Sequence, residues 1–127
     1  MILLDTHLLI WAAADSPRLS RAAREAIEHP DHAPIFSAAS IWEIAVKSAL
    51  GRPGFDIDAR RFRADLLAAG YRELDMTSVH GIDAASLPVL HRDPFDRMLV
   101  GQARAEGLTL YTSDRGVAAY GPPALLV

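Results

Sequence analysis

The sequence predicts an α/β fold in which a parallel β-sheet carries helices on both faces. Short apolar segments, such as residues 2–4 and 109–112, alternate along the chain with longer segments of helical character. Parallel strands require helical crossovers of this kind, whereas antiparallel strands can be joined by short turns. The length of 127 residues, 50% of them hydrophobic, suits one compact domain with a buried core. We therefore expect a single domain over residues 1–127.

The first half of the chain predicts two strand–helix pairs separated by a further helix. An apolar run ends at Asp5, and helix-compatible residues follow until the breaker at Pro17. The next segment has amphipathic spacing up to His29, and a second apolar run precedes Ser37. Gly51 closes the helix that follows. The expected elements are strands over residues 2–4 and 35–36 and helices over residues 6–14, 19–28 and 38–50.

The second half continues the alternation with recognisable helix ends. Asp58 is suited to cap a helix that stops at Gly70. Asp93 followed by Pro94 is a typical start for another helix, which Gly107 ends. The expected elements are helices over residues 59–69, 77–85 and 95–106 and strands over residues 71–74, 109–112 and 125–127.

Four acidic side chains fall at the same edge of the predicted sheet: Asp5, Glu43, Asp96 and Asp114. Asp5 ends the first strand, and Asp114 lies just past the strand that ends at Thr112. Glu43 and Asp96 lie in the first turns of predicted helices. Because ligands of a parallel sheet bind beyond the carboxyl ends of its strands, we expect these acids to face one crevice.

Such a cluster predicts a metal site. Each pair of carboxylates about 5 Å apart repels by roughly 3 kcal/mol at an effective dielectric constant of about 20. The sequence has no cysteine, so a thiolate site is excluded, and carboxylate oxygens select hard ions such as Mg²⁺ or Mn²⁺. An ion held in this way can activate water for phosphodiester hydrolysis.

Each acid also has a purely structural interpretation, which the sequence leaves open. Singly, these interpretations are as good as the functional one, and the shared position at one sheet edge favours function. They are an N-cap at Asp5, a capping box of Ser40 with Glu43 or an exposed Glu43–Lys47 pair, a capping box of Asp93 with Asp96, and an ordinary turn residue at Asp114.

Net charge decides nothing about a nucleic-acid partner. The formal charge of −3 is unfavourable for binding phosphates, but setting aside the four candidate acids as neutralised by metal leaves +1. Twelve of the 13 basic residues are arginines, whose planar group suits phosphate. No apolar run approaches the roughly 20 residues that span a bilayer, so we expect a soluble cytoplasmic protein without a membrane partner.

Four blocks of sequence, spread from end to end, resemble the PIN-domain ribonucleases and, within them, the VapC-type toxins of bacterial toxin–antitoxin pairs. The blocks occur in the family's order, and the third is the most specific. They are LLDTHLLIW at residues 3–11, SAASIWEIAVKSALG at 37–51, LPVLHRDPFDRMLVGQA at 87–103 and LTLYTSDRGVAAYG at 108–121.

The resemblance implies a three-layer α/β/α fold, a Mg²⁺ or Mn²⁺ site and endoribonuclease activity on single-stranded RNA. It also implies a homodimer that a small antitoxin silences by covering the acidic cleft. By motif position, the family's first to fourth acids match Asp5, Glu43, Asp96 and Asp114. Proteins similar to this one use hydroxyls to position such carboxylates, which implies support from Thr112 and, less so, from Thr6.

Several other residues remain open between functional and structural roles. Asp93 can assist the metal or act as an N-cap only. His7 and His91 can bind metal or phosphate, although packing is favoured for His7. Arg60 and Arg61, with Arg63, can contact RNA or form a solvated helix face, and Arg97 can lie near the cleft or pair with a carboxylate.

Two other functions compete with a nuclease. A receiver-like signalling or binding module also has acids at the carboxyl edge of a parallel sheet, but it would place adjacent acids after its first strand and a lysine late in the chain, whereas the only lysine here is Lys47. A catalytically inactive PIN-like domain that only binds proteins is the third possibility, against which the retention of all four acids speaks.

Overall fold

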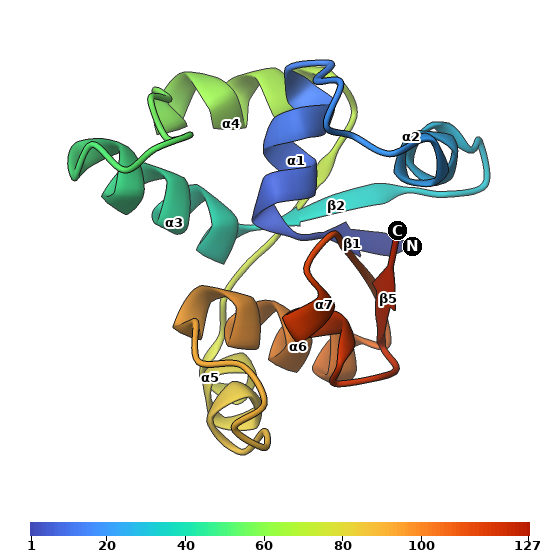
Figure 1. Cartoon of the computed structure of the whole chain (residues 1–127), viewed down its shortest axis with the longest axis vertical. Coiled ribbons are helices and arrows are strands. Elements are labelled where there is room, and N and C mark those ends of the chain that lie inside the picture. Colours follow the sequence, from blue (N-terminus) through green and yellow to red (C-terminus); the bar gives the residue numbers. More distant parts are fainter.

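Five short strands form one parallel sheet in the order β3-β2-β1-β4-β5. The computed structural model describes residues 1–127, and Figure 1 shows the sheet between two layers of helices. The predicted α/β fold is therefore confirmed. The strands are β1 (Ile2–Leu4), β2 (Pro34–Ser37), β3 (Arg72–Leu74), β4 (Thr109–Thr112) and β5 (Ala124–Leu126).

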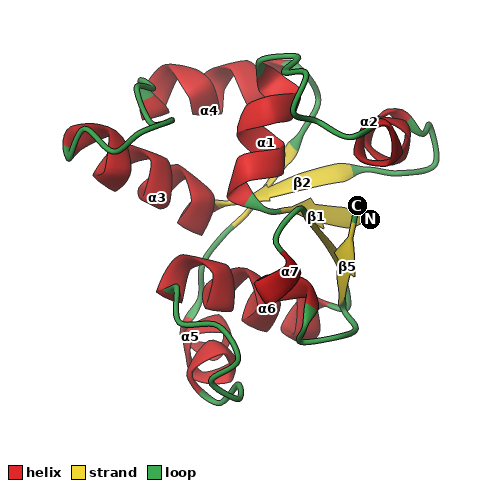
Figure 2. Cartoon of the chain, in the orientation of Figure 1, coloured by secondary structure: helices red, strands yellow, loops and turns green.

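Helices cover both faces of the sheet. In Figures 1 and 2, α1, α2 and α4 lie on one side and α5, α6 and α7 on the other, while α3 extends away from the carboxyl end of β2. None of the helices is long and apolar enough to cross a membrane. The helices are α1 (Thr6–Ala13), α2 (Arg21–Glu28), α3 (Ala38–Ala49), α4 (Ala59–Ala68), α5 (Ser78–Ala85), α6 (Pro94–Glu106) and α7 (Arg115–Ala118).

The core is divided by the sheet into two clusters, because successive side chains of a strand point to opposite faces. Leu3 of β1 packs with Leu99 and Leu110 in the cluster beneath α6. Its neighbours Ile2 and Leu4 belong to the other cluster, which lies under α1, α2 and α4. Strand β1 is thus buried on both faces, as an internal parallel strand requires.

Element boundaries differ from the predicted ones at a few places, for local reasons. Helix α2 begins at Arg21, not at Leu19, because the Ser20 hydroxyl caps it by accepting from the Ala23 amide at 3.0 Å. Helix α7 was not predicted, because residues 113–116 suggest only a turn; Asp114 caps this short helix.

The topology creates a switch point at β1. The chain builds β2 and β3 on one side of β1 and adds β4 and β5 on the other. The loops that follow β1 and β4 therefore diverge at the carboxyl ends of these two strands, which is where parallel sheets bind ligands.

Candidate active site

Asp5 stands directly after β1, where three donors hold its carboxylate. Oδ1 accepts from the Leu8 amide at 2.8 Å, so Asp5 is the N-cap of α1. Oδ2 accepts from Thr112 Oγ1 at 2.6 Å and from the Ser113 amide at 3.1 Å. Only 4% of the residue is exposed, and burial raises the pKa of Asp5, although the three hydrogen bonds oppose that effect.

Glu43 projects from α3 and is 2% exposed. Its Oε1 accepts from Thr6 Oγ1 at 2.6 Å, and its Oε2 pairs with Lys47 Nζ. Lys47 Nζ also lies 3.8 Å from Asp93 Oδ2, so one cation serves two acids. The predicted Glu43–Lys47 pair therefore exists, but Glu43 is buried and Lys47 is partly buried, whereas the sequence suggested an exposed pair.

The alternative capping box of Ser40 with Glu43 is wrong. The N-cap of α3 is Ser37, whose hydroxyl accepts from the Ala39 amide at 3.0 Å. Glu43 consequently lies in the second turn of α3, and its side chain does not cap the helix. Its side chain is directed instead toward Thr6 at the start of α1.

Asp96 lies in the first turn of α6 beside a histidine. Its Oδ2 is 2.7 Å from His91 Nε2. Burial and the neighbouring charge of Asp93 raise the pKa of Asp96 to about 7, although the His91 hydrogen bond opposes this. Asp93 is the N-cap and accepts from the amides of Phe95 and Asp96 at 2.9 and 3.3 Å. The reciprocal box of Asp93 with Asp96 is not formed, because the Asp96 side chain turns to His91.

Asp114 follows β4 and is exposed. Its Oδ1 accepts from the Gly116 amide at 2.7 Å, as the N-cap of α7. Its own amide donates to Thr112 Oγ1 at 3.0 Å. Since the same hydroxyl donates to Asp5, Thr112 ties the acid after β1 to the acid after β4.

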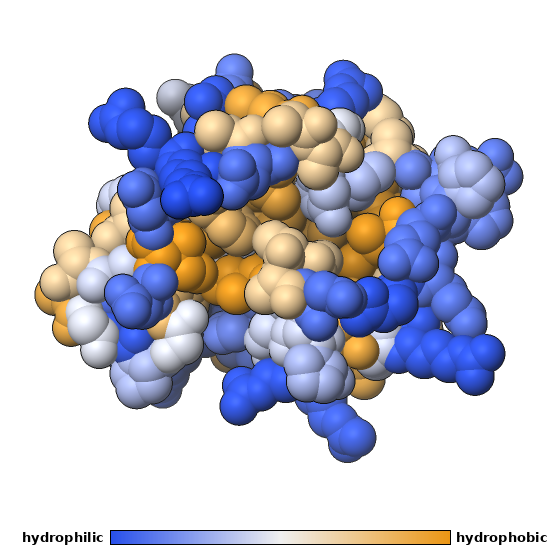
Figure 3. All heavy atoms as spheres, turned by 90° about the horizontal axis from the view of Figure 1, so that it is seen from above, coloured by the Kyte–Doolittle hydropathy of each residue, from blue (hydrophilic) through white to orange (hydrophobic).

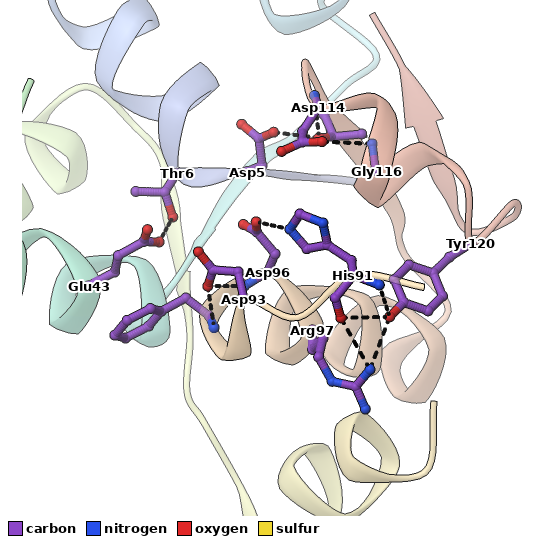
Figure 4. A network of polar contacts seen from close by, with 12 residues as sticks. Asp5, Thr6, Glu43, His91, Asp93, Asp96, Arg97, Asp114, Gly116 and Tyr120 are labelled. Carbon is purple, nitrogen blue, oxygen red and sulfur yellow. Dashed lines mark hydrogen bonds and ion pairs between the residues drawn. The ribbon is translucent and has the colours of Figure 1, made fainter. Parts of the chain in front are cut away.

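Figure 4 shows these acids around one space beyond the carboxyl ends of the strands. We call them the acidic site: Asp5, Glu43, Asp93, Asp96 and Asp114. Lys47 pairs with Glu43 and Asp93, but no lysine or arginine forms an ion pair with Asp5, Asp96 or Asp114. The site thus carries an excess of negative charge that attracts a cation.

The donor set fits a divalent ion. All five acids offer hard carboxylate oxygens, which Mg²⁺ and Mn²⁺ prefer. One ligand atom each from His91, Asp96 and Asp114 lie within 4.8 Å of one another. An ion in this place would offset the repulsion that raises the pKa of Asp96.

The interpretation of Arg97 as the partner of a carboxylate is wrong, whereas a contact of Arg97 with RNA stays a prediction. Its guanidinium donates to the carbonyls of Ala84, Leu87 and Pro88 at 3.1, 3.2 and 3.1 Å and to the Tyr120 hydroxyl at 3.0 Å. In Figure 4 it points away from the acids. Arg97 thus ties the end of α5 and the loop between α5 and α6 to Tyr120.

The remaining basic and histidine candidates lie outside the acidic site. Arg60 and Arg61 are exposed in the first turn of α4, where a contact with RNA stays a prediction. Arg63 donates two hydrogen bonds of 2.9 Å to the carboxylate of Glu73. His7 packs its exposed ring near Trp11, with ring centroids 5.7 Å apart.

Two contacts of the site were not predicted: the hydrogen bond between His91 and Asp96, and the approach of Lys47 to Asp93. The signal for Lys47 was its i+4 spacing from Glu43 on one helix. For His91 the signal was its place in the loop just before the Asp93-Pro94 helix start.

Known proteins match this chain over nearly its whole length. The model of the PIN domain family matches residues 2–121. Ribonuclease VapC22 of Mycobacterium tuberculosis is 32% identical over 123 residues, which cover 96% of this chain and 93% of that protein.

Solved structures share the fold at lower identity. A toxin–antitoxin complex from Klebsiella pneumoniae superimposes with a TM-score of 0.69 at 17% identity, covering 98% of this chain and 96% of that one. VapC20 of Mycobacterium tuberculosis, described as a toxin that cleaves the sarcin–ricin loop, has a TM-score of 0.69 at 19% identity and covers 95% of each chain.

Proposed function

Because this chain belongs to the PIN domain family, we propose that it is a metal-dependent endoribonuclease that hydrolyses phosphodiester bonds in single-stranded RNA, as the toxin of a toxin–antitoxin pair. The proposal is supported by a relative of nearly the same length that is a ribonuclease, 32% identical. The observation that carries it is the gathering of acids from β1, α3, α6 and the β4–α7 junction at the switch point of the sheet.

The chain's own residues prepare this site for an ion and a phosphodiester. Asp5, Glu43, Asp96 and Asp114 would hold Mg²⁺ or Mn²⁺, and Asp93 lies beside them. A bound ion would supply an activated water and neutralise phosphate charge. Hydroxyls fix the carboxylates on both sides of the site, because Thr112 donates to Asp5 and Thr6 donates to Glu43.

The test is cleavage of total RNA with Mg²⁺, with Mn²⁺ or with EDTA. We expect cutting by the wild-type protein with metal and none in EDTA, and we expect Asp96→Asn to be inactive. Asp31→Asn is the matched control, because the Asp31 side chain is 87% exposed outside the site. Equal cutting in EDTA contradicts the metal mechanism, and no cutting under any condition supports an inactive binding domain. A mass gain with acetyl phosphate would indicate a receiver.

An antitoxin is the expected protein partner, because the Klebsiella pneumoniae structure is a toxin–antitoxin complex. A hollow of about 780 Å³ lies between α1, α3 and α4, with Ile10, Phe55 and Phe62 among its lining residues. Figure 3 shows hydrophobic side chains at the surface of the face that α1 and α4 cover. We expect an apolar antitoxin segment to bind there, while a basic side chain reaches the acids.

The experiment for this partner is copurification with the product of a short gene beside this one. A stable complex that blocks RNA cleavage is expected. Phe62→Asp should abolish it without loss of cleavage, because Phe62 lines the hollow and not the acidic site. Unchanged binding by that variant contradicts the placement.

A homodimer is the second expected assembly. Helix α5 exposes Val79 and Ile82, the latter by 65%, and Trp42 of α3 is also exposed. Met76 and Trp42 line one small apolar hollow together with Phe95, next to Asp96. A second copy would cover this apolar surface. Light scattering should show a dimer that Ile82→Lys converts to a monomer; an unchanged mass contradicts this interface.

A further inference from the structure

The imidazole of His91 lies among the acids. Its Nε2 is 2.7 Å from Asp96 Oδ2. A ring nitrogen of His91, an oxygen of Asp96 and an oxygen of Asp114 lie mutually within 4.8 Å. These three groups come from the loop before α6, from α6 itself and from the start of α7. His91 thus lies between Asp96 of α6 and Asp114 at the start of α7, which come together only in the folded chain.

The backbone of His91 is held on the side opposite the acids. The His91 carbonyl lies 3.3 Å from the Tyr120 hydroxyl and 3.4 Å from Arg97 Nη1. The His91 amide donates to the same hydroxyl at 3.3 Å. Tyr120 and Arg97 therefore fix the loop from which the imidazole projects toward Asp96 (Figure 4).

Gly116 leaves the space that the ring requires. A Cβ atom at this position would lie 2.7 Å from His91 Nδ1 and 3.0 Å from Asp114 Oδ1. Such a distance forces the ring to move. A residue without a side chain at the start of α7 therefore lets His91 and Asp114 approach each other.

The arrangement matches the requirements of a mixed nitrogen and oxygen metal site. Two neighbouring ligands of an octahedral ion, each about 2.1 Å from it, lie about 3 Å apart. The His91–Asp96 separation is close to this value, and an oxygen of Asp114 lies within 4.8 Å of both groups, so a small shift of its side chain would bring it to the same ion. Imidazole suits transition metals, whereas Mg²⁺ prefers oxygen ligands only.

We propose that His91 is a nitrogen ligand of the metal site, together with Asp96 and Asp114, and that it gives the site a preference for Mn²⁺ over Mg²⁺. The inference rests on the proposed function, because it takes the acidic site to bind a divalent ion. It adds a ligand outside the four acids and a consequence for metal choice.

The test is pulsed electron paramagnetic resonance of bound Mn²⁺, which detects a coordinated imidazole nitrogen without any activity assay. We expect the nitrogen signal in the wild-type protein and in His7→Gln, and its loss in His91→Gln. His7→Gln is the matched control, because that ring packs on Trp11 and Phe55. Calorimetry should show Mn²⁺ binding weakened by about tenfold or more in His91→Gln, with a smaller change for Mg²⁺.

Gly116→Ala gives a second variant that keeps His91 itself. Its Cβ should displace the ring and weaken the nitrogen signal. If His91→Gln fails to fold, as judged by circular dichroism, this variant decides alone.

The outcomes separate the inference from the proposed function. Mn²⁺ bound without a nitrogen signal, or a signal that persists in His91→Gln, overturns the ligand role and leaves the metal site. Equal weakening of Mn²⁺ and Mg²⁺ binding in His91→Gln overturns the preference for Mn²⁺. Failure of the wild-type protein to bind Mn²⁺ overturns both the inference and the proposed metal mechanism.

Discussion

Thr112 Oγ1 lies 2.6 Å from Asp5 Oδ2, although the two residues are 107 positions apart in the chain. The parallel pairing of β1 with β4 produces this contact, because its register sets Leu4 opposite Tyr111, so the next residues of the two strands emerge side by side. The hydroxyl has no exposure to water, so its hydrogen bond is not exchanged for solvent.

Replacing Thr112 by valine should therefore damage the site more than the fold. Valine keeps the shape but leaves Asp5 Oδ2 with one donor fewer and the Asp114 amide without its acceptor. We expect RNA cleavage to fall by about tenfold to a hundredfold and the free energy of unfolding to fall by about 1–3 kcal/mol. Thr109→Val, at the start of the same strand, is the control and should retain activity. Full activity of Thr112→Val would show that the hydroxyl does not position Asp5.

Two substitutions of site acids should have opposite effects on stability. Asp96→Asn removes a charge that burial and Asp93 disfavour, so the metal-free protein should become more stable. Asp5→Asn should be less stable, because an amide replaces one of two acceptor oxygens that together receive three hydrogen bonds. Both variants should lose RNA cleavage. Urea unfolding in EDTA measures the difference, and a stabilised Asp5→Asn would contradict the structural role given to that carboxylate.

The raised pKa of Asp96 predicts how the stability of the metal-free protein depends on pH. The pKa is about 7 in the folded chain and near the ordinary 3.8 in the unfolded chain, so the folded state binds the extra proton. The stability gained in this way is present below about pH 4 and is lost as the pH rises through about 7. The wild-type protein should thus lose stability relative to Asp96→Asn over this range, measured by urea unfolding in EDTA. A constant difference between the two proteins would contradict the raised pKa.

Local signals in the sequence were enough to predict every helix except α7, the five strands and the edge at which the acids meet. Asp58 and the Asp93-Pro94 pair start helices where predicted, since N-caps depend on adjacent residues only. Gly107 ends α6 in the left-handed conformation, with φ of 66°.

What the sequence could not predict depends on distant segments. The direction of the Arg97 side chain follows from the carbonyls that the end of α5 and the α5–α6 loop turn toward it, and the burial of Glu43 follows from the packing of α3 near Thr6. Neither feature can be predicted from the spacing of residues along the sequence. The His91–Asp96 bond similarly requires the loop conformation that Tyr120 fixes from 29 positions away.

In the metal-free protein, the positive charge of Lys47 should partly do what a bound ion would do for Glu43 and Asp93. It pairs with the buried Glu43 and approaches Asp93, so Lys47→Met leaves two carboxylates without their cation. We expect the metal-free variant to lose about 1–3 kcal/mol of unfolding free energy and to be stabilised by Mn²⁺ more strongly than the wild-type protein, because the ion then offsets more charge. Arg21→Met breaks another i,i+4 pair, but an exposed one, and should change stability by less than about 0.5 kcal/mol. Thermal unfolding with and without Mn²⁺ checks this prediction. If Mn²⁺ stabilises Lys47→Met and the wild-type protein equally, Lys47 and the ion neutralise different acids.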